Sequence, residues 1–119
     1  MRHHDDPSSL LAALLAALDE RDPTRAAQAL WPLLGPRPAA QVGDEAGLAR
    51  LLGNDRHRPL LAPAARHLRA LDARERAARA ELTVTPSDGD APHGWLITLA
   101  RVAGGRWFVS GLQREGFEG

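Results

Sequence analysis

Residues 64–85 read AARHLRALDARERAARAELTVT, and the fold depends on whether this stretch forms helix or strand. Its content of Ala, Arg, Glu and Leu favours helix, and its apolar residues up to Leu82 nearly make a helical stripe. Glu75 interrupts that stripe, and from Ala78 to Thr85 apolar and polar residues alternate strictly. Alternation over eight residues is a more specific signal than propensity, so we predict extended strands here.

The same stretch begins a run of four predicted antiparallel strands. Their ranges are Arg66–Asp72, Glu75–Pro86, His93–Ala103 and Arg106–Arg114. The turn-forming residues 86–90 separate the second strand from the third, and Gly104-Gly105 predicts a tight hairpin between the last two. A helical regulatory module over residues 64–82 is the alternative if the strand prediction is wrong.

The first half of the chain predicts helices. Ser8 or Ser9 can cap a helix whose leucines share one face over residues 10–18. Asp22 followed by Pro23 is a second helix start, because the carboxylate can accept backbone N–H bonds and proline suits the first turn.

Prolines and glycines divide this helical half. Pro32 is expected to end the second helix near Trp31, and residues 35–38 are predicted to be non-helical because they contain two prolines and a glycine. A third helix is predicted from Asp44 as its cap to Gly53 as its stop.

The fold class that follows is α+β, because helices precede an antiparallel sheet in so short a chain. The chain has 119 residues, and folding should remove about two thirds of its extended surface from water, enough for one core. We therefore predict one domain over residues 8–115, preceded by a flexible tail at residues 1–7.

Composition restricts the partners. Fifteen arginines balance fifteen acidic residues, with no lysine, so the chain has no long-range field to attract nucleic acid or an anionic membrane. Cysteine is absent, which excludes disulfides and thiol chemistry.

The longest apolar run, residues 10–18, is about half of the ~20 residues that a membrane span needs. The acidic residues on both sides of this run disfavour a signal peptide, so a cytoplasmic location is expected.

The strand region resembles a known superfamily. The segments ELTVTPSDG at 81–89, WLITL at 95–99 and GRWFVSGL at 105–112 are similar to the closing strands of nuclear transport factor 2-like, or cystatin-like, proteins. Upstream, LDERDPTRA at 18–26 resembles the junction of the first two helices in these proteins. VGDEAGLAR at 42–50 resembles the third helix of an uncharacterised branch, with Val42 in place of the usual Phe.

The resemblance implies a cone, in which a curved antiparallel sheet wraps around helices and its mouth holds a small apolar molecule. It would place Trp31, Leu82 and Val84 around such a ligand. Members of the superfamily include isomerases, hydrolases and many proteins without chemistry, so the resemblance does not decide the function. A non-catalytic binding role is favoured, with a small isomerase- or hydrolase-type enzyme as the alternative.

An enzyme on this scaffold would need an acid or base inside the cone. If the apolar residues of the second strand point inward, Arg79 and Glu81 point outward into water. A register shifted by one residue would bring both into the cavity as an acid/base pair. His57, between the third helix and the sheet, is the histidine best placed to face a pocket.

No metal or cofactor is expected. His3 and His4 lie beside acidic residues in the predicted tail, but no histidine pair has the spacing of a helical zinc site. Ser110 lacks a nucleophile motif, and no phosphate-binding loop is present.

The last two strands carry apolar residues on both faces, and one small domain has no spare layer to cover the second face. We therefore predict a homodimer through the outer faces of the sheets, with Trp95 or Trp107 at or near its interface. Arginine stems and the first helix shielding that face are the alternative.

Overall fold

The structure is a computed structural model that describes residues 6–102 and 105–115. It confirms the α+β class, with four α-helices, two 3-10 turns and four strands in the described ranges. The helices are α1 (Pro7–Ala17), α2 (Pro23–Leu30), α3 (Pro36–Val42) and α4 (Glu45–Leu52), with 3-10 turns η1 (Trp31–Leu33) and η2 (Arg58–Leu60). The strands are β1 (Ala65–Ala73), β2 (Ala77–Thr85), β3 (His93–Arg101) and β4 (Trp107–Arg114).

The strands form one antiparallel sheet in the order β1-β2-β3-β4, so the strand prediction for residues 64–85 is confirmed. Burial alternates along β2 as the sequence pattern indicated. Ala78, Ala80, Leu82 and Val84 are buried, and the residues between them face away from the core. Tertiary packing therefore overrides the helix propensity of this stretch.

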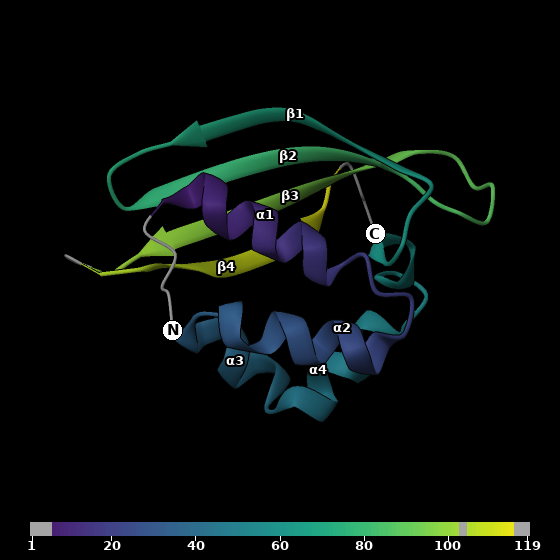
Figure 1. Cartoon of the computed structure of the whole chain (residues 1–119), viewed down its shortest axis with the longest axis horizontal. Coiled ribbons are helices and arrows are strands. Elements are labelled where there is room, and N and C mark those ends of the chain that lie inside the picture. The colour runs from purple at the N-terminus through teal and green to yellow at the C-terminus, as the bar shows by residue number, and fades with distance from the viewer. Residues whose placement is uncertain (1–5, 103–104, 116–119) are drawn as a thin grey trace.

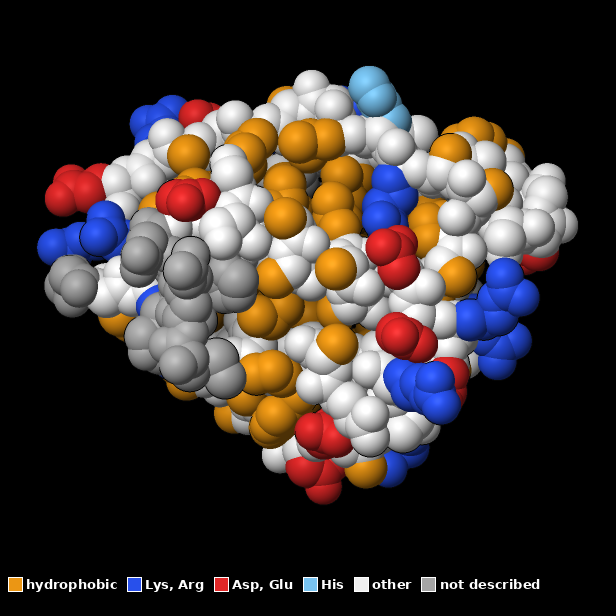
Figure 2. Space-filling view, in the orientation of Figure 1, with side chains coloured by type: hydrophobic (Ala, Val, Ile, Leu, Met, Phe, Trp, Pro, Cys, Tyr) orange, Lys and Arg blue, Asp and Glu red, His pale blue; other side chains and the backbone are white. Residues whose placement is uncertain are grey.

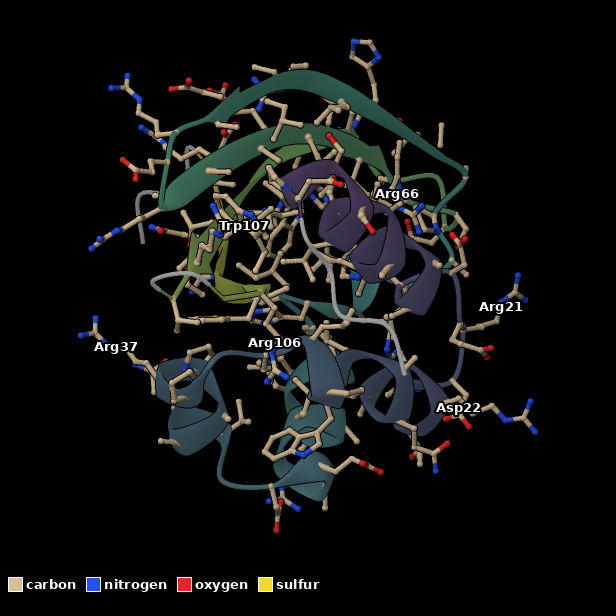
Figure 3. All side chains as sticks on the ribbon, turned by 60° about the vertical axis from the view of Figure 1, so that its left-hand side comes forward. Arg21, Asp22, Arg37, Arg66, Arg106 and Trp107 are labelled. Carbon is tan, nitrogen blue, oxygen red and sulfur yellow. The ribbon has the colours of Figure 1, made fainter. Side chains whose placement is uncertain are left out.

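The sheet is curved, and α1 lies across its concave face, while α2, α3 and α4 form a further layer beneath (Figure 1). The leucines of α1 fill the space under the sheet, and Leu10 and Leu14 have no exposed surface. Trp107 points from β4 into the space between sheet and helices, whereas Arg21 and Arg37 project into solvent (Figure 3). The predicted arrangement of helices on a curved sheet is confirmed.

Aspartates cap three of the helices. The side chain of Asp22 accepts the N–H of Thr24 at 3.1 Å, and that of Asp44 accepts the N–H of Gly47 at 2.7 Å, as predicted. The cap of α1 is Asp6, which accepts the N–H of Ser9 at 2.8 Å, so the prediction of Ser8 or Ser9 as the cap is wrong.

The N-terminal boundary changes with that cap. Asp6 and Pro7 belong to the start of α1 and not to a tail, because proline is well suited to the first helical position. Residues 1–5, which include His3 and His4, lie outside the described residues, as does Gly104 of the predicted hairpin turn.

The prediction that residues 35–38 are non-helical is also wrong, because α3 begins at Pro36. The first turn of a helix has backbone N–H groups without intrahelical partners, so Pro36 and Pro38 cost it little. The second helix does end where Pro32 predicted, since α2 stops at Leu30 and continues as η1.

The outer edge of β4 is paired at Val109 with the segment that leads into α3. Leu34 forms a parallel bridge with Val109, and the N–H of Gly35 donates to the carbonyl of Val109 at 2.8 Å. A Cβ at position 35 would lie 2.1 Å from the ring of Phe108, so only glycine fits there without displacing that ring. At the opposite side of the sheet, β1 is an edge strand.

Candidate ligand-binding site

A cavity of about 120 Å³ lies between β4 and the helices. Every layer of the fold contributes to its wall, and most of the wall is apolar. It is lined by Leu14, Leu30, Leu34, Pro38, Gln41, Val42, Leu48, Leu51, Leu52, His57, Val109, Ser110, Gly111 and Leu112. Within this set His57 is the one side chain that carries an ionisable group.

A bulge in β4 shapes one side of this wall. The register of β3 with β4 shifts between Thr98 and Leu99, which leaves an extra residue at Ser110. The Ser110 hydroxyl donates to Oγ1 of Thr98 at 3.2 Å, so it is engaged on the sheet. After the bulge Leu112 pairs with Ile97, a core residue, and it lines the cavity, whereas strict alternation from Trp107 would place it on the outer face.

His57 is held between a turn and a buried tryptophan. Its backbone N–H donates to Oδ1 of Asn54 at 2.8 Å, and its Nδ1 lies 3.0 Å from the same oxygen. Its ring centroid is 5.6 Å from that of Trp95, with the rings tilted by 51°. These contacts fix both the position and the orientation of the imidazole.

Burial lowers the pKa of His57 from its ordinary value of 6.5, and the neighbouring Arg56 guanidinium lowers it further. His57 is therefore neutral at pH 7. Burial, and then Arg114, also lower the pKa of His93, although Asp90 and Asp88 act in the opposite direction. The indole N–H of Trp95 donates to Nδ1 of His93 at 2.7 Å, which requires that nitrogen to be unprotonated.

The predicted ligand contacts do not line this cavity. Leu82 and Val84 are 1% and 0% exposed and belong to the buried core on the concave face of the sheet, across which α1 lies (Figure 1). Trp31 is half-buried against the core but is absent from the cavity wall. The cavity lies instead at the β4 side of the sheet.

The predicted catalytic pair lies on the opposite face of the sheet. Arg79 and Glu81 alternate with the buried residues of β2, and Arg79 is exposed. Glu81 lies 3.8 Å from Arg69, which also pairs with Glu115. Sequence alternation therefore predicted the outward direction correctly, and neither residue can act on a molecule in the cavity.

Trp95 and Trp107 are 0% and 4% exposed, so they present almost no surface to a second chain. Their prediction as interface residues is wrong, because the inner sheet face needs large side chains to fill the space above the helices. On the outer face β3 and β4 carry Leu96, Ala100 and Phe108, each already half-buried.

The exposed large hydrophobic side chains of the described residues lie elsewhere. They are Leu68, which is 42% exposed, and Val102, which is 51% exposed. Leu68 pairs with buried Leu82 and so belongs to the inner face of the sheet, but at its open edge. The 2.5 Å ion pair of Arg66 with Asp19 joins β1 to the turn that follows α1.

On α1, Ala12 and Ala16 are exposed and Leu15 is half-buried, and on β1 Leu71 is half-buried. We call these four residues, together with Leu68, the α1–β1 seam. Figure 2 shows hydrophobic side chains running down the middle of the face that carries α1.

A larger and open cleft of about 750 Å³ lies between the start of α2 and the turn after β2. Arg21, Arg58, Asp55, Asp88 and Asp90 border it. Its mixed charges are spread over a wide polar surface, and within the described ranges no group of three or more His, Asp or Glu side chains has metal-binding geometry. No helix among residues 6–102 and 105–115 is long and apolar enough to cross a membrane.

Most of the cavity wall was not predictable from periodicity. Leu48, Leu51 and Leu52 carry a helical core signal, but that signal does not distinguish a residue beside a void from one in a filled core. Gln41 and Val42 were missed because α3 itself was not expected.

The chain matches no protein-family model, and no curated protein or solved structure is detectably similar to it.

Proposed function

We propose that the chain binds a small apolar molecule in the cavity between β4 and the helices, and that it does so without chemistry. The observation that carries the proposal is the cavity itself, with an apolar wall from four helices and one strand and a single neutral imidazole. Concave apolar sites with few polar groups are typical of ligand-binding pockets. A cone of the nuclear transport factor 2-like kind remains our proposal for the wider family.

The residues around the cavity favour binding over catalysis. General acid–base chemistry needs groups within hydrogen-bond reach of the substrate, commonly in pairs. His57 is the one such group in the described cavity wall, because Glu81 and Arg79 face outward and the Ser110 hydroxyl is bonded to Thr98. An enzyme with His57 alone is the weaker candidate.

Toluene is a suitable probe, since an engineered apolar cavity of about 150 Å³ holds benzene. We expect millimolar toluene to raise the melting temperature of the chain, because a molecule that binds only the folded state stabilises it. Val42→Phe, which fills the cavity, should abolish that rise. Ala40→Phe on the exposed side of the same helix should leave it unchanged.

A rise of equal size in wild type and Val42→Phe would show that toluene binds elsewhere. No rise in the wild type would reject the proposed function. Chemical-shift changes of the cavity methyl groups in NMR spectra provide the independent measurement, because they locate the bound probe directly.

The α1–β1 seam supports a second proposal, a symmetric homodimer in which two copies of the seam meet. Leu68 is its exposed large apolar side chain, and the Arg66–Asp19 ion pair places both signs of charge on β1 and on the turn after α1. A two-fold axis requires such a self-complementary surface. The edge of β1 adds unpaired backbone groups that a second β1 can satisfy.

Sedimentation at micromolar concentration should therefore show a species of twice the 12.8 kDa chain mass. Leu68→Asp is expected to return the chain to a monomer, because two carboxylates would meet across the axis. Val102→Asp removes the other exposed large hydrophobic side chain of the described residues, which is not part of the seam. The protein with this substitution should remain dimeric. A wild-type monomer, or dissociation by both substitutions alike, would contradict this interface.

A further inference from the structure

We infer that the molecule bound in the cavity is a neutral hydrogen-bond donor, an alcohol, phenol or N–H compound with an apolar body, whose donor group meets Nε2 of His57. The inference rests on the proposed binding function and specifies its ligand class. Its basis is the position of the proton on the imidazole ring of His57, which the side chain of Asn54 determines.

The side-chain amide of Asn54 selects one tautomer of His57. Its Oδ1 accepts the backbone N–H of His57 at 2.8 Å, which establishes that the oxygen, and not the amide nitrogen, faces the histidine. The same oxygen lies 3.0 Å from Nδ1. A carbonyl oxygen only accepts hydrogen bonds, so Nδ1 must carry the proton. In the neutral ring Nε2 is then unprotonated and is an acceptor.

This acceptor is available to a ligand. Nε2 has no hydrogen-bond partner among the described residues. Every fully buried side-chain nitrogen or oxygen of those residues does have a partner, so Nε2 is not fully buried. Nε2 is therefore accessible, and the ring to which it belongs lines the cavity. Trp95 packs against the ring, with the two ring centroids 5.6 Å apart.

The rest of the wall restricts the charge and size of the ligand. No acidic or basic side chain other than His57 belongs to the described lining, so an ionised ligand would lose its hydration without gaining a counter-charge. A cavity of about 120 Å³ is comparable in size to one of about 150 Å³ that holds benzene, so a body of one six-membered ring is the appropriate size. Phenol combines these properties. Toluene has the same ring with a methyl group in place of the hydroxyl group, so it serves as the control ligand that lacks a hydrogen-bond donor.

The experiment measures the dissociation constants of phenol and toluene for the full chain and for His57→Phe by NMR titration. Phenylalanine keeps the ring against Trp95 but removes the acceptor. We expect phenol to bind about tenfold more weakly to the variant, because its buried hydroxyl is left without a partner. Toluene affinity should change less than about threefold, since its contacts are apolar.

Asn54→Ala provides a second variant, because it removes the oxygen that holds the proton on Nδ1 while keeping the imidazole. We expect it to weaken phenol selectively, and the ¹⁵N shifts of His57 to lose the signature of an unprotonated Nε2. Thermal unfolding of each variant checks that it is folded.

The outcomes separate the two proposals. Two outcomes would overturn the donor inference while the apolar site remains supported. In the first, toluene binds and His57→Phe weakens the affinity for phenol and for toluene equally. In the second, toluene binds the wild type and phenol does not. Failure of both probes to bind the wild type would reject the binding function itself. A wild-type His57 with its proton on Nε2 would overturn the inference directly.

Discussion

Replacement of Trp95 by alanine is expected to destabilise the folded chain by about 3–5 kcal/mol. Trp95 has no exposed surface and is the largest fully buried side chain of the core. Its removal leaves a cavity between β3 and the helices, and it also removes the indole partner of His93 and the surface on which His57 packs. Urea denaturation followed by circular dichroism measures the loss as a lower midpoint.

Trp31→Ala is the matched control, since it removes the same side chain from a half-buried position in η1. The cost there should be clearly smaller, because part of the Trp31 ring is already in contact with water. Equal losses at the two positions would contradict the inward placement of Trp95. That result would also reopen the prediction that Trp95 contacts a second chain.

Ala80→Asp is expected to have an effect of similar size, about 3–5 kcal/mol, because it places an unpaired carboxylate in the core. Ala80 is 0% exposed and lies opposite Ile97 in the sheet. Part of the loss should be recovered at acidic pH, where the carboxyl is protonated and its burial costs less. Chemical denaturation at pH 7 and at pH 4 tests both statements, with the wild type measured at each pH.

Ala77→Asp changes the same residue type in the same strand but on an exposed position, beside Arg76. Its expected effect is within about 0.5 kcal/mol, as is usual for surface substitutions. The difference between the two variants measures the inward and outward alternation of β2. Similar effects of both substitutions would show that residues 77–85 do not form a strand with one buried face.

The sheet was predictable because alternation is a property of the strand itself. The residues from Ala78 to Val84 carry that pattern whether or not the rest of the chain is known, and burial follows it residue by residue. The helix starts at Asp22 and Asp44 were predictable for the same reason, since capping is local. The direction of Glu81 followed from the register.

The interface and cavity residues were not predictable in the same way. Trp95 and Trp107 are apolar residues on an inward face, and nothing local distinguishes a core tryptophan from one at an interface. The cavity depends on how the helices pack against β4 and on the bulge at Ser110, which moves Leu112 to the inner face. Both are tertiary features, and α3 escaped detection because prolines were read as breakers and not as a first turn.

The two margins of the sheet differ in a way that limits how large an assembly can grow. The bridge of Leu34 with Val109 and the bond from Gly35 occupy the β4 margin, whereas the β1 margin remains open. If two copies pair through β1, as in the proposed dimer, that margin is no longer open to a third copy. The pairing of Val109 with a segment of its own chain therefore removes part of the β4 margin as a template for another strand.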